Sequence, residues 1–400
     1  MQSLSRPARD VKPLLIFVHG SAEMYGSDKV LLNLAEGAVV DGQLQPVVVL
    51  HEHGPLREAL QRAGAEVHVA KVCKIHRSML TAAAPFTLWH QLRRASADLD
   101  AVVAGRSVAL VYSNTLAVLG GAVWARRRGY RHVWHVHEIL LRPWIVRRGL
   151  PWLAERLSDS VISNSHQTES WLLQQAPRLR SRSVVIFNGL KPVVHPAASD
   201  IKAFRSLIGA EDSDLVVTVA GRLNHWKGQG LLIEALALLR DAGQLGCLRV
   251  AVVGDVFSGH DDIRGGLMAK TQGLGLEDKV RFVPFVDDIY TVWFASDIAV
   301  VPSLEPEPFG MVAIEAMACA LPVVAAAHGG LLDIVAPQQT GLLFQPRNAR
   351  ALADSLLTLA RDAPLRRRLG TAGAQRQRDL FSLQSQVERT RAVWRRLVNA

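Results

Sequence analysis

Short apolar runs alternate with amphipathic, helix-like stretches along most of the chain. In the first half the apolar runs have the length of strands and end in Gly, Asn, Ser, His or Glu: LLIFVHG, PVVVLHEHG, EVHVAKV, ALVYSN, RHVWHVHEI, SVISNS and SVVIFNG. This alternation is typical of parallel sheets covered by helices. Polar residues at strand ends are typical of an edge that faces a ligand. The pattern therefore predicts an α/β fold.

The pattern stops once and then restarts. Residues 191–200, KPVVHPAASD, are rich in Pro and small residues, and the next apolar runs are DLVVTVAGR, LRVAVVGD, KVRFVPFV, DIAVVPS and LPVVAAA. Four hundred residues exceed one ordinary core. We therefore predict two doubly wound, Rossmann-like domains, 1–195 and 196–370, with a nucleotide cleft between them. Residues 371–400 are predicted to form a basic C-terminal helix.

Composition narrows the class of protein. Apolar residues make up 49% of the chain and charged residues 20%, so it can bury cores. The three cysteines have no paired spacing, which disfavours a disulfide framework or a zinc site and favours a reducing compartment. Residues 1–12 lack the apolar centre of a signal peptide, and no apolar run approaches the ~18 residues of a membrane span. We expect a soluble or peripheral protein.

The charge is distributed unevenly. Residues 1–200 carry a net charge of +9, residues 201–360 carry −6 and residues 361–400 carry +7. A basic surface can bind nucleic acid, anionic lipid or a phosphorylated substrate, or can simply be solvated. Three segments of the first half, 87–99, 124–134 and 142–157, mix Trp with Arg, which suits an interfacial helix on anionic lipid. The aromatics lie beside apolar helices and form no RNA-binding strand motif, so no nucleic-acid partner is predicted.

Residues 216–239, VVTVAGRLNHWKGQGLLIEALALL, carry the first candidate site. A predicted strand ends at Gly221 and Arg222, a short loop holds Lys227, and a helix begins near Gln229. Two cations beside a glycine turn and a helix N-terminus suit a diphosphate. The alternative is a surface loop with ordinary charges.

Several carboxylates lie close together at the start of a predicted apolar helix, in residues 303–325, SLEPEPFGMVAIEAMACALPVVA. Pro308 and Gly310 predict where this helix begins and presents free backbone N–H groups. Glu315 lies five residues beyond Gly310, roughly 7–8 Å along a helix, about the distance from a diphosphate to its ribose. Carboxylates at Glu307 and Glu315 can accept hydroxyl hydrogen bonds. The alternative for Glu315 is a solvent-facing helix residue.

Together GRLNHWKG and EPFGMVAIEAMACALPVVA closely resemble the C-terminal signature of the retaining GT-B glycosyltransferases of family 4, and Glu307 and Glu315 match its E-x7-E spacing. The resemblance implies that Arg222 and Lys227 clamp the donor diphosphate, that Glu315 binds the ribose and that Glu307 binds the donor sugar. Further donor contacts are implied for Gly221, Pro308, Phe309, Gly310 and Met311. Ala320 stands where the family commonly has Gly.

Weaker resemblances lie in the first half. YGSDKVLLNLA is similar to the family's glycine loop and first helix, which implies that Gly26 lets the backbone approach the diphosphate. HVHE is similar to the catalytic-site histidine segment. His135 and His137 fall on one strand face, and we favour His137 near the donor sugar because Glu138 follows it. The family's last helix crosses back to the N-terminal, acceptor-binding domain.

The resemblance implies a retaining glycosyltransferase that uses a UDP- or GDP-linked sugar and needs neither metal nor cofactor. We predict a lipid-linked or polysaccharide acceptor in bacterial surface glycan synthesis, and a peripheral position on the cytoplasmic face of the inner membrane. The alternatives are another GT-B nucleotide-sugar enzyme, such as an epimerase or soluble sugar synthase, and a basic polyanion- or membrane-binding protein.

Overall fold

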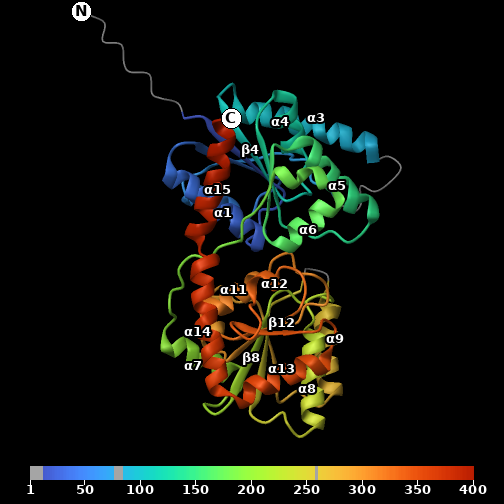
Figure 1. Cartoon of the computed structure of the whole chain (residues 1–400), viewed down its shortest axis with the longest axis vertical. Coiled ribbons are helices and arrows are strands. Elements are labelled where there is room, and N and C mark those ends of the chain that lie inside the picture. Colours follow the sequence, from blue (N-terminus) through green and yellow to red (C-terminus); the bar gives the residue numbers. More distant parts are fainter. Residues whose placement is uncertain (1–11, 76–83, 257–259) are drawn as a thin grey trace, which may run out of the picture. The chain divides into compact units, whose positions relative to one another are not determined.

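A computed structural model describes residues 12–75, 84–256 and 260–400. The expectation about a signal peptide falls on residues that lie almost wholly outside this part. The chain forms two compact units (Figure 1). The first contains the described residues up to Asn164, with Glu169–Ile186 and Val387–Ala400, and the second contains Ser165–Thr168 and Phe187–Gln386.

The first unit is built on a parallel sheet whose strands lie in the order β3-β2-β1-β4-β5-β6-β7. Its strands are β1 (Leu14–His19), β2 (Gln45–Leu50), β3 (Glu66–Val69), β4 (Val108–Asn114), β5 (His132–Val136), β6 (Ser160–Ser163) and β7 (Ser183–Val185). Its helices are α1 (Gly26–Asp41), α2 (Pro55–Arg62), α3 (Ala84–Val103), α4 (Gly120–Arg128), α5 (Trp144–Leu157) and most of α6 (His166–Gln175). All the predicted strands of this half are present.

The second unit is also built on a parallel sheet, whose strands lie in the order β10-β9-β8-β11-β12-β13. Its strands are β8 (Leu215–Ala220), β9 (Leu248–Val253), β10 (Val280–Val283), β11 (Ile298–Val301), β12 (Val323–Ala326) and β13 (Gly341–Phe344). Its helices are α7 (Ala198–Leu207), α8 (Gln229–Asp241), α9 (Asp261–Gly273), α10 (Ile289–Phe294), α11 (Met311–Ala318), α12 (Leu331–Ile334), α13 (Ala349–Arg361) and α14 (Ala363–Leu380). The predicted α/β class with two parallel sheets is confirmed.

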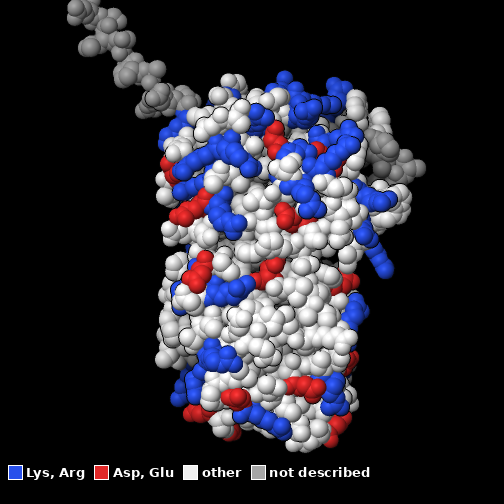
Figure 2. All heavy atoms as spheres, viewed as in Figure 1, with Lys and Arg blue, Asp and Glu red and all other residues white. Residues whose placement is uncertain are grey.

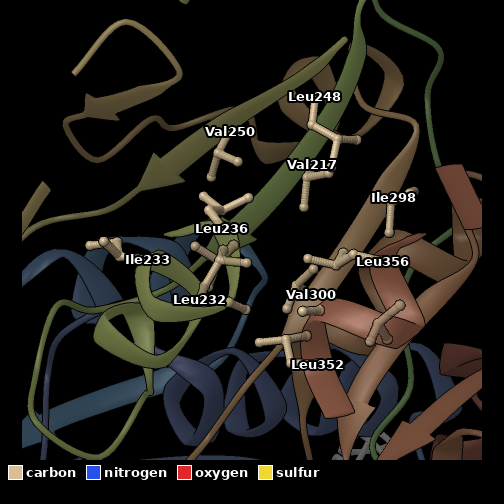
Figure 3. Packing of buried hydrophobic residues seen from close by; sticks show 14 of the residues in the cluster. Val217, Leu232, Ile233, Leu236, Leu248, Val250, Ile298, Val300, Leu352 and Leu356 are labelled. Atoms are coloured by element: carbon tan, nitrogen blue, oxygen red, sulfur yellow. The ribbon is translucent and has the colours of Figure 1, made fainter. Parts of the chain in front are cut away.

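A dense apolar core fixes one face of the second sheet. Leu232 and Leu236 of α8, with Leu352 and Leu356 of α13, point toward the strand residue Val300 and its neighbours (Figure 3). All of them are fully or almost fully buried. Burying each such side chain contributes about 1.5–3 kcal/mol. This packing holds the start of α8, and the loop before it, against the sheet.

Both sheets reverse their order of connection at one point. Successive strands run outward from β1 through β2 to β3, and then from β4 to β7 on the other side; β8 and β11 play the same part in the second unit. At such a switch point the loops leave in opposite directions and open a crevice beyond the strand ends. The segments after β1, β4, β8 and β11 are therefore where each unit can hold a ligand.

The last helix, α15 (Leu383–Val398), begins in the second unit and ends in the first. Within the first unit, Arg391 and Arg395 form ion pairs with Asp41 at 3.6 and 3.2 Å. The Trp394 ring meets Tyr112 edge-on, with ring centroids 5.9 Å apart. Aromatic packing and paired charges thus fix the end of the chain on this unit.

Three details differ from the sequence expectation. Residues 371–400, predicted as one helix, comprise the end of α14 and the whole of α15, which are separated at Phe381 and Ser382. Residues 341–344 form the edge strand β13, which the apolar pattern did not predict, because four residues between Thr340 and Gln345 are too short for a periodic signal. Ala320 follows α11 with a φ of 57°, in the left-handed region that favours glycine.

No helix within the described residues is long and apolar enough to span a membrane.

Candidate active site

The loop after β8 positions two cations of the second unit. The side chain of Asn224 accepts hydrogen bonds from the backbone N–H of Trp226 (3.2 Å) and Lys227 (2.9 Å), which folds the loop back on itself. Gly228 then begins α8 with a φ of 77°, and a Cβ there would lie 1.9 Å from the Pro302 carbonyl oxygen. Only glycine fits. The predicted residues Arg222 and Lys227 are thereby held at the carboxyl end of the central strand β8.

The structure joins Lys227 to Glu307. The Lys227 Nζ lies 2.6 Å from Glu307 Oε1, and the Ser303 hydroxyl donates to the same oxygen at 2.6 Å. Glu307 is 4% exposed. A buried carboxylate needs such partners, because desolvation disfavours an unpaired charge. Two predicted site residues, one from the loop after β8 and one from the loop after β11, therefore form one charged centre.

A glycine pair holds the backbone of Glu307. Gly329 has a φ of 62°, and a Cβ there would lie 2.3 Å from the Glu307 carbonyl oxygen. The Gly330 N–H donates to that oxygen at 2.7 Å. The sequence shows the pair of glycines in HGGLLDIV, but it does not indicate which residue they contact.

The helix α11 begins where the sequence predicts it. Gly310 precedes Met311, the first residue of α11, and Phe309 is buried. The Pro308 carbonyl oxygen accepts hydrogen bonds from the hydroxyls of Ser165 (2.6 Å) and Thr168 (3.0 Å). The first amides of a helix have no partner within it, so they can serve a ligand. Sequence reasoning missed Ser165 and Thr168, which lie more than a hundred positions away.

Glu315 lies on the buried side of α11. It is 9% exposed, which excludes the solvent-facing alternative. Burial, followed by the nearby Glu315 carboxylate, raises the pKa of Cys319 to about 12 and raises the pKa of Tyr290 on α10. The second carboxylate of the E-x7-E pair is thus buried on α11 and close enough to Tyr290 of α10 to influence its pKa.

The predicted histidine of the first unit belongs to a neutral network. His135 is fully buried and its Nδ1 lies 2.7 Å from the Tyr112 hydroxyl, whereas His137 is partly exposed and its Nε2 lies 2.8 Å from Asn114 Oδ1. Their ring centroids are 3.9 Å apart, so both are on one face. Burial lowers the pKa of His135 to about 3 and holds the pKa of His137 well below its usual value, with His135 adding to the effect.

Gly26, also predicted as a donor contact, is the first residue of α1. The N–H of the preceding Tyr25 donates to the Asp28 carboxylate at 3.0 Å, which closes the first turn of the helix. Gly26 and His137 thus follow strands of the first unit, whereas the residues of the E-x7-E motif, Arg222 and Lys227 belong to the second.

A surface groove of about 520 Å³ lies beside the loop after β8, lined in part by His225, Trp226, His260 and Arg347. None of the predicted donor-binding residues lines it. Within the described residues no group of three or more His, Cys, Asp or Glu side chains could hold a metal ion.

Two family descriptions match the chain. Residues 24–193 match Glycosyltransferase Family 4 and residues 200–376 match Glycosyl transferases group 1. The chain belongs to these glycosyltransferase families. The family resemblance of its motifs is thereby confirmed.

Known proteins agree with this assignment. The chain is 35% identical over 221 residues to D-inositol 3-phosphate glycosyltransferase from Stackebrandtia nassauensis, an alignment that covers 54% of this chain and 49% of the relative. The chain spans about half the length of the curated relatives that it matches.

Solved structures cover nearly the whole chain. HepE from Anabaena in complex with UDP is 26% identical, with a TM-score of 0.81 over 95% of this chain and 98% of that one. The same protein has also been solved with UDP-glucose, and that structure matches with a TM-score of 0.79 over 94% and 98%. A glycosyltransferase from Rickettsia africae, 18% identical with a TM-score of 0.82 over 96% and 99%, shares the fold. The predicted GT-B class is confirmed.

Proposed function

We propose that this protein is a retaining, metal-independent glycosyltransferase that uses a nucleoside diphosphate sugar. The observation that carries the proposal is the charged centre of the second unit, in which Lys227, Glu307 and Ser303 meet beside the start of α11. The similarity to HepE, which binds UDP and UDP-glucose, supports UDP over GDP as the first donor nucleotide to test.

Each residue of the second unit has a proposed role. Arg222 and Lys227 bind the diphosphate and stabilise its charge as the sugar leaves. Glu315 accepts hydrogen bonds from the ribose hydroxyls, and Glu307 accepts them from the donor sugar. The remaining donor contacts are proposed for the backbone near the strand and helix ends: Gly221, Pro308, Phe309, Gly310 and Met311.

The ion pair between Lys227 and Glu307 can exchange partners with a bound substrate. In the structure each charge neutralises the other. A bound diphosphate would offer Lys227 a second anion, and sugar hydroxyls would offer Glu307 neutral donors. The partners can therefore be shared with the substrate without leaving either charge unpaired, which is the condition for keeping charges in a buried site.

The proposed reaction moves one sugar with retained configuration. The bond from the anomeric carbon to the diphosphate oxygen breaks, a bond from that carbon to the acceptor oxygen forms on the same face, and the acceptor proton passes to the diphosphate. His137 and Gly26 of the first unit are also proposed to contact the donor. Positive side chains supply the charge stabilisation that a metal provides elsewhere.

The decisive test is the configuration of the product. UDP-glucose has an α linkage, so retention predicts an α-glucosyl product, read by proton NMR of the transfer or slow hydrolysis reaction in EDTA. A β product would contradict the retaining mechanism, and activity restored only by added Mg²⁺ would contradict metal independence. Formation of a different hexose with no transfer would favour the epimerase alternative.

We further propose a lipid-linked or polysaccharide acceptor, used in bacterial surface glycan synthesis at the cytoplasmic face of the inner membrane. The support is α5, where Trp144, Ile145 and Trp152 are 68%, 57% and 51% exposed. The exposed Arg147, Arg148 and Arg156 lie among them, and Lys and Arg gather over this unit on the face shown in Figure 2. Exposed tryptophans among arginines favour an anionic membrane surface.

Vesicle sedimentation tests this surface. The protein is expected to bind vesicles that contain anionic lipid and not neutral ones, and the double variant Trp144→Ser with Trp152→Ser should bind less. Val40→Ser, which changes an even more exposed apolar residue on α1, is the control and should bind as the wild type does. Indifference of the wild type to vesicle charge would contradict the membrane proposal.

A further inference from the structure

Asn114, the last residue of β4, links three elements of the first unit. It is fully buried, and its side-chain amide contacts the first turn of α1, the end of β1 and the residue after β5. In the sequence it is only one of several polar residues that end a predicted strand, here ALVYSN. Its place at the switch point between β1 and β4 gives it access to all three segments at once.

The orientation of the Asn114 amide follows from its partners. Its Nδ2 lies 3.1 Å from the Ser27 carbonyl oxygen, which can only accept a hydrogen bond. The amide nitrogen must therefore face Ser27, and the amide oxygen faces His137 Nε2 at 2.8 Å. Because that oxygen can only accept, the proton of the neutral His137 ring belongs on Nε2.

A second histidine, His19, contacts the side-chain amide of Asn114. His19 Nδ1 lies 3.1 Å from Asn114 Nδ2, and His19 Nε2 lies 2.6 Å from Asp28 Oδ1. Both His19 and Asp28 are 1% exposed. The Asp28 carboxylate is itself fixed by the Tyr25 N–H. The side chains from Asp28 to His137 thus form one continuous, buried chain of hydrogen bonds.

We propose that Asn114 is a positioning residue that fixes His137 with its proton on Nε2, so that Nδ1 can only accept a hydrogen bond from a hydroxyl of the transferred sugar. This inference rests on the proposed function for its ligand, but the tautomer itself rests on the contacts of Asn114 alone. It adds a requirement to the donor: the sugar must present a hydroxyl, and not only an acceptor, toward His137.

The tautomer can be read directly in the full-length protein. Nitrogen NMR with histidine-selective ¹⁵N labelling at pH 7.5, with His137 identified by its loss in His137→Gln, is expected to show Nε2 protonated and Nδ1 unprotonated. A protonated Nδ1 in the wild type would overturn the inference. This spectrum needs no substrate and no altered Asn114, so it decides the question even if an Asn114 variant fails to fold.

Two variants then separate positioning from mere packing. Asn114→Ala should lose the protected Nε2 proton of His137 and raise the KM for UDP-glucose about 3- to 10-fold, the size of one hydrogen bond. The Kd for UDP, which has no sugar, should stay unchanged. Ser113→Ala is the control, because it removes a buried hydroxyl on the same strand that contacts His132 instead. It should change neither His137 nor the KM.

The outcomes distinguish this inference from the proposed function. An unchanged His137 proton and an unchanged KM in Asn114→Ala would contradict the positioning role. A wild type that binds neither UDP nor UDP-glucose would contradict the proposed function, whereas the wild-type spectrum would still show which nitrogen of His137 carries the proton.

Discussion

Both units are built on parallel sheets, but the side chains at their strand ends interact in different ways. In the second unit they carry charges that pair directly, as Lys227 does with Glu307. In the first unit they carry side chains linked by hydrogen bonds, and the pKa values of His135 and His137 are lowered by burial. A charged pair can exchange partners with an ionic ligand, whereas neutral histidine rings held by hydrogen bonds keep a fixed orientation. The contrast fits the proposed roles, in which residues of the second unit bind the donor diphosphate and residues of the first unit orient the sugar.

Breaking the charged pair should give the largest effect. Lys227→Met leaves the Glu307 carboxylate buried without its cation, which should lower the free energy of unfolding by about 3 kcal/mol and the transfer rate on the order of 10²–10³-fold. Lys270→Met is the matched control, because Lys270 pairs with Glu234 on an exposed surface, where such pairs contribute ~1 kcal/mol or less. Chemical denaturation and initial rates measure both. Equal effects of the two variants would remove the special role of Lys227.

The first unit should be the more sensitive to acid. Burial lowers the pKa of His132 and of His135 to about 3, so both stay neutral in the folded chain while the unfolded chain takes up protons below about pH 6.5. The unfolded state binds more protons there, so stability falls as the pH falls. Between pH 6.5 and 5 we expect a loss of about 2 kcal/mol for each ring.

Denaturation at several pH values, with and without His135→Gln, tests this difference. The free energy of unfolding of the variant should fall less steeply between pH 6.5 and 5, because its unfolding takes up about one proton fewer. A wild-type stability that is flat over this range would contradict the neutral state of the two rings.

Backbone packing around Glu307 gives the next effect. Gly329→Ala should lower the free energy of unfolding by about 2 kcal/mol or more, because a Cβ would meet the Glu307 backbone and the φ of 62° is left-handed. Gly243→Ala has a nearly equal φ of 65° but open space around its Cβ, so it should lose only about 1 kcal/mol. The difference between the two melting curves isolates the contact. If both variants melt alike, the contact with Glu307 is unimportant.

The smallest effect concerns a place where this chain departs from its family. Ala320→Gly should raise the free energy of unfolding by about 1 kcal/mol, because it relieves the left-handed backbone at the end of α11. Thermal melting measures it. A destabilised variant would mean that the unfolded-state entropy of glycine outweighs the strain.

Sequence reasoning placed Glu307 and Glu315 at one helix start, but it did not foresee which side chains meet in the first unit, and the reason is physical. Glu307 and Glu315 lie within three turns of chain around one helix start, so local periodicity places both. Asn114 and His19 meet across 95 positions because β1 and β4 are neighbours, and Ser165 reaches Pro308 across 143. Such contacts depend on strand order, which the apolar pattern of a single sequence does not determine. Apolar periodicity predicted every strand of the first sheet, but the short edge strand β13 had too few residues to be recognised.

We propose that the strand ends of the second unit bind a nucleoside diphosphate through Arg222, Lys227 and Glu315. The most direct test is thermal stabilisation by UDP, GDP, ADP and CMP in EDTA, measured for the wild type, Glu315→Ala and the exposed control Glu305→Ala. We predict that UDP at 100 times its Kd adds about 2.7 kcal/mol of stability, that Glu305→Ala keeps this gain and that Glu315→Ala loses it. No stabilisation of the wild type by any of these nucleotides would contradict the account.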